Sequence, residues 1–152
     1  MHSLRHWTLA VAEAVLFRDV EALVCTFLSR RLSAVFPGLN VYPGQLFPGA
    51  PQIGIRVPNP RPSEFIRVMR TGGPKETLVS EAAQITVEAW AQSEQRASLL
   101  LSQCRALLNA ADETIYGVKE FSGPANLPDP LSAQIRYTMS FQVRARGTVI
   151  SA

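Results

Sequence analysis

Residues 133–146 read AQIRYTMSFQVRAR, a stretch in which apolar and polar side chains alternate without a break. This alternation is typical of a β-strand that packs one face on the core and turns the other to solvent. Seven consecutive matches predict a long antiparallel strand, because antiparallel sheets commonly keep one face solvated. Its polar face carries Arg136, Arg144 and Arg146.

Shorter strand patterns precede this stretch. Residues 65–71 are rich in apolar and β-branched side chains, and a Gly-Gly-Pro turn follows them. Residues 84–91 alternate again, with Trp90 on the polar face. Residues 53–57 form a brief alternating run, and residues 115–121 predict one more short strand, which we expect to end at Gly123-Pro124.

Two helices are predicted from apolar residues that recur every three or four positions. The first begins after Asp19, a suitable N-cap, and ends before Pro37-Gly38. The second follows Ser93 and keeps its apolar stripe to Ala111. The element order predicts an α+β fold, with about four antiparallel strands, two helices packed on one face, and long Pro-rich loops.

The Pro-rich segments are the least ordinary part of the sequence. Seven of the eleven prolines lie in residues 37–62, and a second group forms Leu127-Pro128-Asp129-Pro130. Proline excludes helix and central strand, yet the first segment also contains many apolar residues. Loops longer than ~12–15 residues are usually functional or disordered. The apolar content favours a functional loop that another surface covers.

Length and composition indicate a single domain that associates with copies of itself. The chain has 152 residues, of which 47% are hydrophobic and 18% are charged. An average domain is about 25% charged. We expect residues 1–18 to form an N-terminal extension or the start of the first helix, residues 19–147 a single domain, and residues 148–152 a tail. The low charge suggests that copies of the chain cover part of its surface.

The charge pattern argues against nucleic-acid recognition. The net charge of +3 is slight for a protein that binds phosphates. Thirteen of the fifteen cations are arginine, which favours protein interfaces, although a GC-rich genome explains the same bias. No apolar run approaches the ~18–20 residues of a membrane span, so no membrane association is expected.

Catalytic and metal-binding residues are scarce. The only histidines are His2 and His6, and the only thiols, Cys25 and Cys104, fall on the apolar stripes of the predicted helices. A nucleophile with a histidine base therefore cannot be assembled within the domain. We expect no catalytic site, no cofactor and no metal, and hence a binding or structural protein rather than an enzyme.

Several residues are candidates for a protein interface. Trp90 is an aromatic residue on a polar strand face, and interface anchors are enriched in Trp and Arg. A helix or loop of the same subunit covering Trp90 is the alternative, and simple solvation is the alternative for Arg67 and Arg70. The full candidate set is Arg56, Arg67, Arg70, Trp90, Arg136, Arg144 and Arg146.

The order of these motifs resembles a known family. A Pro-rich approach leads into Phe65 to Gly73, then Ala89-Trp90-Ala91 leads into a helix. Gly123-Pro124 precedes the Leu-Pro-Asp-Pro group, and Arg136-Tyr137 opens the last strand, which ends at Arg146-Gly147. From about residue 19 to 147 this order resembles the tail terminator proteins of long-tailed, siphovirus-type phages of actinobacteria.

The resemblance implies a virion structural protein. Tail terminators form a ring, expected here to be a hexamer, on the finished tail tube, where they stop polymerisation of the major tail protein. The ring lies at the head-proximal end of the tail, offers a docking surface to head-completion or stopper proteins, and lets DNA pass without sequence-specific binding. Assembly would take place in the host cytoplasm. A neighbouring head–tail connector or stopper is the alternative, and a stand-alone ligand-binding α+β domain is a further one.

Overall fold

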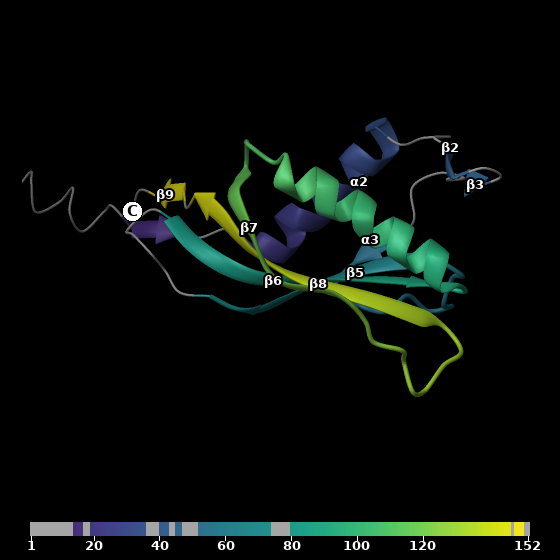
Figure 1. Ribbon diagram of the computed structural model, residues 1–152. Coiled ribbons are helices and arrows are strands. Elements are labelled where there is room, and N and C mark those ends of the chain that lie inside the picture. Colours follow the sequence, from purple (N-terminus) through teal and green to yellow (C-terminus); the bar gives the residue numbers. More distant parts are fainter. Residues whose placement is uncertain are drawn as a thin grey trace, which may run out of the picture.

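The computed structural model describes residues 14–16, 19–35, 40–42, 45–46, 52–73, 80–146 and 148–150. Within them the chain has the expected α+β fold, with two helices and a five-stranded mixed sheet (Figure 1). The helices are α2 (Val20–Val35) and α3 (Glu94–Asn109). The strands, in spatial order, are β4 (Gln52–Gly54), β5 (Phe65–Gly72), β6 (Ser80–Ala91), β8 (Ile135–Arg146) and β7 (Ile115–Asn126).

The centre of the sheet is the antiparallel pair β6–β8. Its register runs unbroken from Ser80 opposite Arg146 to Ala91 opposite Ile135. The predicted alternation is confirmed, because Met139, Phe141 and the apolar residues that follow them on β8 are buried on one face. The alternating side chains of β6 join the same core, including Ile85, Val87, Ala89 and Ala91.

The expectation of about four antiparallel strands holds only in part, because the sheet has five strands and is mixed. A fifth strand, β4, lies at the edge and pairs parallel to β5, from Gln52 opposite Phe65 to Gly54 opposite Arg67. Residues 55–64 return the chain to the end of the sheet at which β4 begins, so that β5 runs parallel to β4. Strand β4 forms three pairs with β5, and its edge position suits a segment rich in proline.

Strand β7 does not end at Gly123-Pro124 but continues to Asn126. Shifts in its register against β8 absorb the interruption, as β-bulges do. Gly123 has a φ of +97°, and a Cβ there would lie 2.8 Å from the Thr138 carbonyl oxygen. Glycine therefore allows the two strands to stay paired past the proline.

Both helices cover the same face of the sheet (Figure 1). Asp19 caps α2 by accepting the Ala22 amide at 3.2 Å. Ser93 caps α3 by accepting the Arg96 amide at 3.2 Å. Both caps confirm the sequence prediction. On α3 the buried stripe includes Cys104, and on α2 the buried residues recur every fourth position: Val20, Val24, Leu28 and Leu32.

Two small strand pairs lie outside the main sheet. Strand β1 (Ala14–Leu16) pairs with β9 (Thr148–Ile150), and β2 (Asn40–Tyr42) pairs with β3 (Gln45–Leu46). The helical alternative for residues 1–18 is therefore wrong at 14–16, because these residues pair with the end of the chain. The rest of 1–18, and most of the Pro-rich segment before Gln52, lie outside the described residues.

Candidate functional site

The sheet face opposite the helices is formed by the side chains that alternate with the core. On β6 and β8 they lie opposite one another: Trp90 with Arg136, Glu88 with Thr138, and Thr86 with Ser140. The hydroxyls of Thr86 and Ser140 are 2.9 Å apart. No described helix covers this face (Figure 1). This polar face of the sheet therefore has no described helix packed on it.

At one end of this face Trp90 is enclosed by aromatic and cationic groups. Its ring stacks on Phe65, the residue opposite it on β5, with centroids 5.2 Å apart and planes at 16°. The guanidinium carbons of Arg61 and Arg136 lie 5.3 Å and 5.2 Å from the ring centroid. Both distances are within the range of cation–π attraction. Trp90 is 3% exposed.

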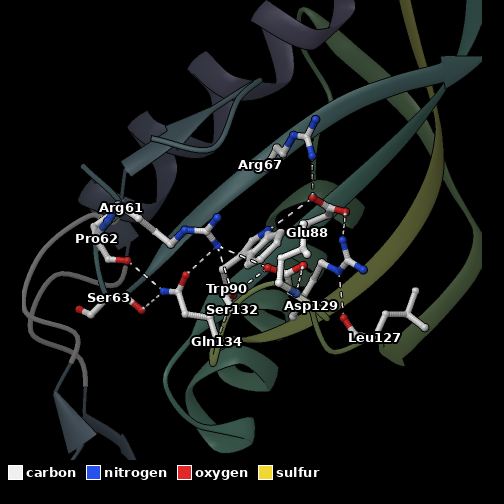
Figure 2. Close-up of polar contacts among 12 residues, drawn as sticks. Arg61, Pro62, Ser63, Arg67, Glu88, Trp90, Leu127, Asp129, Ser132 and Gln134 are labelled. Carbon is white, nitrogen blue, oxygen red and sulfur yellow. Dashed lines mark hydrogen bonds and ion pairs between the residues drawn. The ribbon is translucent and has the colours of Figure 1, made fainter. Parts of the chain in front are cut away.

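A buried carboxylate lies beside this ring. Glu88 Oε1 accepts the Trp90 indole N–H at 3.4 Å and lies 3.6 Å from Arg67 Nη1. The other oxygen, Oε2, lies 3.5 Å from Arg136 Nη1. The Glu88 side chain is only 8% exposed, so its charge needs these two cations. We call Arg61, Arg67 and Arg136, with Glu88 and Trp90, the arginine cluster (Figure 2).

Arg61 connects the arginine cluster to the loop between β7 and β8. It donates to Gln134 Oε1 at 3.2 Å and to Ser132 Oγ at 3.4 Å, and it lies 3.7 Å from Asp129. The hydrogen bond from Ser132 lowers the pKa of Asp129, and the Leu131 amide and the charges of the nearby arginines lower it further, against some desolvation. Asp129 therefore stays ionised beside Arg61.

Backbone carbonyls complete the junction of the two Pro-rich segments. The side-chain amide nitrogen of Gln134, Nε2, donates to the backbone carbonyls of Pro62 and Ser63 at 2.9 Å and 3.0 Å. Arg136 Nε donates to the Leu127 carbonyl at 2.9 Å, on the opposite side of the cluster (Figure 2). The cluster thus holds both loops against the sheet.

Apolar side chains surround this junction. Ile55 is 45% exposed, and its carbonyl accepts from Arg67 Nε at 3.3 Å. Leu127 and Leu131 are also exposed, although they flank the polar centre. Arginine forks beside exposed leucine and isoleucine are what a protein interface uses. Chemically, the arrangement can bind another protein surface.

Three of the seven candidate residues meet in the arginine cluster: Arg67, Trp90 and Arg136. The other four do not. Arg56 is exposed beyond β4, Arg70 turns back to the carbonyls of Gly72 and Gly73, and Arg144 lies beside Gly117. The side chain of Arg146 lies outside the described residues.

Trp90 lies on the predicted polar face of its strand, but its own chain covers it, which was the alternative to an interface anchor. Arg61 and the Pro-rich segment close over the ring that the sheet leaves bare. The sequence reasoning missed Arg61, Glu88 and the stack of Phe65 on Trp90. Glu88 and Trp90 are two residues apart on the polar face, a visible signal, but the Phe65 contact depends on strand register, which the sequence does not state.

The two thiols lie in the helix layer, where Cys104 is fully enclosed and Cys25 is half-buried. Burial raises the pKa of Cys104 to about 12, and burial together with Glu21 and Asp19 raises the pKa of Cys25 to about 11. In the part of the chain that the structure describes, no group of three His, Cys, Asp or Glu residues is placed to hold a metal ion. Neither described helix has the length and apolar character needed to cross a membrane.

The fold and the cluster define a small α+β domain whose arginine cluster lies on the sheet face opposite the helices. No protein-family model matches the chain. No curated protein matches it by sequence.

Proposed function

We propose that this protein is a tail terminator, a virion structural protein that forms a ring on the completed tail tube of a long-tailed phage. The ring, a hexamer, stops polymerisation of the tube protein at the head-proximal end and offers a surface to head-completion proteins. DNA passes through it without sequence-specific contacts. The protein acts by binding, and the proposal gives it no catalytic step.

The observation that carries this proposal is the arginine cluster on the uncovered sheet face. It contacts both Pro-rich segments, and the exposed side chains of Ile55, Leu127 and Leu131 belong to the same segments. Arg is enriched at protein interfaces, and a surface whose side chains are already held in place loses little entropy on binding. Such a surface is suited to a protein whose role is to assemble.

The residues that carry the family resemblance support the same reading. Trp90, Arg136 and the Leu-Pro-Asp-Pro group are far apart in the sequence, yet they lie in or against the arginine cluster. Trp90 is itself buried there and contacts Arg61 and Arg136. The gathering of these motifs on the uncovered face favours a shared binding role.

The sheet edges also favour a closed assembly. Strand β4 is three residues long, and β7 shifts its register against β8 in three places. Short and bulged edges resist open-ended strand addition between copies. Contacts through loops and faces remain, and these can close into a ring.

Purified protein added to polymerising tail tubes tests the proposal. We expect electron microscopy to show it at one end of each tube, with elongation stopped there. Arg67→Ala, which removes one arm of the cluster, should weaken capping, whereas Arg105→Ala on the helix side should not. Binding only to head connectors would indicate a stopper, and a stable monomer that never binds tubes would contradict the proposal.

A further inference from the structure

The arginine cluster and the adjacent Asp129 hold more cations than anions. Arg67 and Arg136 share one carboxylate, that of Glu88. Arg61 lies beside the other, that of Asp129. Three guanidinium groups therefore face two carboxylates, and one positive charge at this end of the sheet face is left without an anion of its own.

The two carboxylates are more deeply buried than the guanidinium groups around them. The side chains of Glu88 and Asp129 are 8% and 12% exposed. The side chains of Arg61, Arg67 and Arg136 are 36%, 31% and 24% exposed. A molecule that approaches this face therefore meets the cations before the anions.

Two of these guanidinium groups keep hydrogen-bond donors to spare. Arg67 donates from Nε to the Ile55 carbonyl and pairs through Nη1 with Glu88 (Figure 2). Arg136 donates from Nε to the Leu127 carbonyl and pairs through Nη1 with the same carboxylate. A guanidinium has five N–H donors, and among the described residues neither Nη2 has an acceptor.

Exposed apolar side chains accompany these donors. Three of the four large apolar side chains that the described chain exposes belong to the Pro-rich segments at the cluster: Ile55, Leu127 and Leu131. Two of them, Ile55 and Leu127, supply the carbonyls that hold Arg67 and Arg136. Each of the two cations is thus fixed to a residue whose apolar side chain is open to a partner.

The chemistry of this face favours an acidic protein surface over a nucleic acid. A guanidinium pairs with carboxylate and phosphate alike. Phosphate contacts do not cover apolar side chains, however, and a net charge of +3 is slight for a protein that binds a polyanion. Protein interfaces combine apolar contacts with complementary charge.

We infer that this end of the sheet face binds an acidic surface of a partner protein. Carboxylates of the partner accept from Nη2 of Arg67 and Arg136, and its apolar side chains contact Ile55 and Leu127. The inference names the chemistry of the surface that the proposed ring meets, and in that respect it rests on the proposed function.

Nuclear magnetic resonance with an acidic peptide tests the inference. The sequence has two tryptophans, Trp7 and Trp90, and the Trp90 indole N–H donates to Glu88 within the cluster. A peptide of Glu-Glu-Leu repeats should shift the Trp90 indole signal, which Trp90→Phe identifies. A peptide of Gln-Gln-Leu repeats, which has the same shape without the charge, should leave that signal in place.

Arg67→Gln should weaken binding of the acidic peptide about tenfold, as loss of one interface ion pair does. Arg105→Gln is the matched control, because Arg105 also pairs with a carboxylate, Glu120, but lies on helix α3. Its affinity should match that of the unaltered protein. Because Arg67→Gln also removes a cation from Glu88, salt supplies a second measurement on the unaltered chain, whose affinity should fall as ionic strength rises.

Equal weakening in the two variants, a Trp90 signal that the acidic peptide does not shift, or affinity unaffected by salt would overturn the inference. So would a shift caused by short duplex DNA and not by the peptide, which would make the face a phosphate-binding surface. The outcomes separate the two proposals. Capping of tubes without peptide binding rejects only this inference, and peptide binding without capping rejects only the terminator function.

Discussion

Replacing Trp90 with alanine removes the central ring of the arginine cluster. Trp90 is 3% exposed, stacks on Phe65 at 5.2 Å, and lies within 5.3 Å of two guanidinium groups. The vacated space cannot refill, because Phe65 and the two arginines are held by strands and by other partners. Core Trp→Ala changes lower the free energy of unfolding by about 3–5 kcal/mol.

For a domain of this size that loss corresponds to a melting temperature lower by roughly 6–20 °C. Circular dichroism on heating measures it, and Phe121→Ala is the control, because that aromatic residue is 66% exposed and should leave the melt unchanged. Trp90→Phe should retain most of the stability, since the stack survives. An unaltered melt for Trp90→Ala, with loss of association only, would show that Trp90 faces a partner and refute the burial described here.

Three further predictions concern buried polar groups. Glu88→Gln leaves two arginines without their shared anion and should lower the unfolding free energy by about 1–3 kcal/mol. Glu113→Gln, at an exposed pair, should change it by less than about 1 kcal/mol, and equal effects in urea denaturation would contradict the cluster. The side-chain amide of Gln103 is buried with no hydrogen-bond partner in the described structure, so Gln103→Met should raise the unfolding free energy by about 1 kcal/mol, and a loss would reveal a missed partner. Burial raises the pKa of Cys104 from an ordinary 9.0 to about 12, so between these two pH values only the unfolded protein loses the thiol proton. The free energy of unfolding should therefore fall as the pH rises from 9.0 to about 12. Cys104→Ala should flatten that slope in urea titrations, and an identical slope would place the titration elsewhere.

Period-two and helical patterns were enough to predict most elements of this fold. The alternation in β8 and β6 depends only on which side chains face the core, so it is visible in one dimension. The caps at Asp19 and Ser93 could also be predicted, because each cap depends only on residues next to it in the sequence. The lengths of β6 and β7 were underestimated, because strand ends depend on the partner strand, and β7 passes Gly123-Pro124 by shifting its register.

The candidate site was less predictable from the sequence, because it depends on long-range pairing. Arg67, Trp90 and Arg136 could be suspected separately from their strand faces. That they surround Glu88 follows from the β5–β6–β8 register. Arg61 comes from a Pro-rich crossover without any periodicity, so no pattern indicated that it would cover Trp90.

The length of the tails made without this protein tests the terminator proposal most directly. The proposal requires that a long-tailed phage encodes this chain; deletion of its gene should then give headless tails of abnormal and variable length in electron micrographs, and supplying the intact chain should restore a single length. Tails of normal length in its absence would contradict the proposal and indicate a connector that acts after the tube is complete.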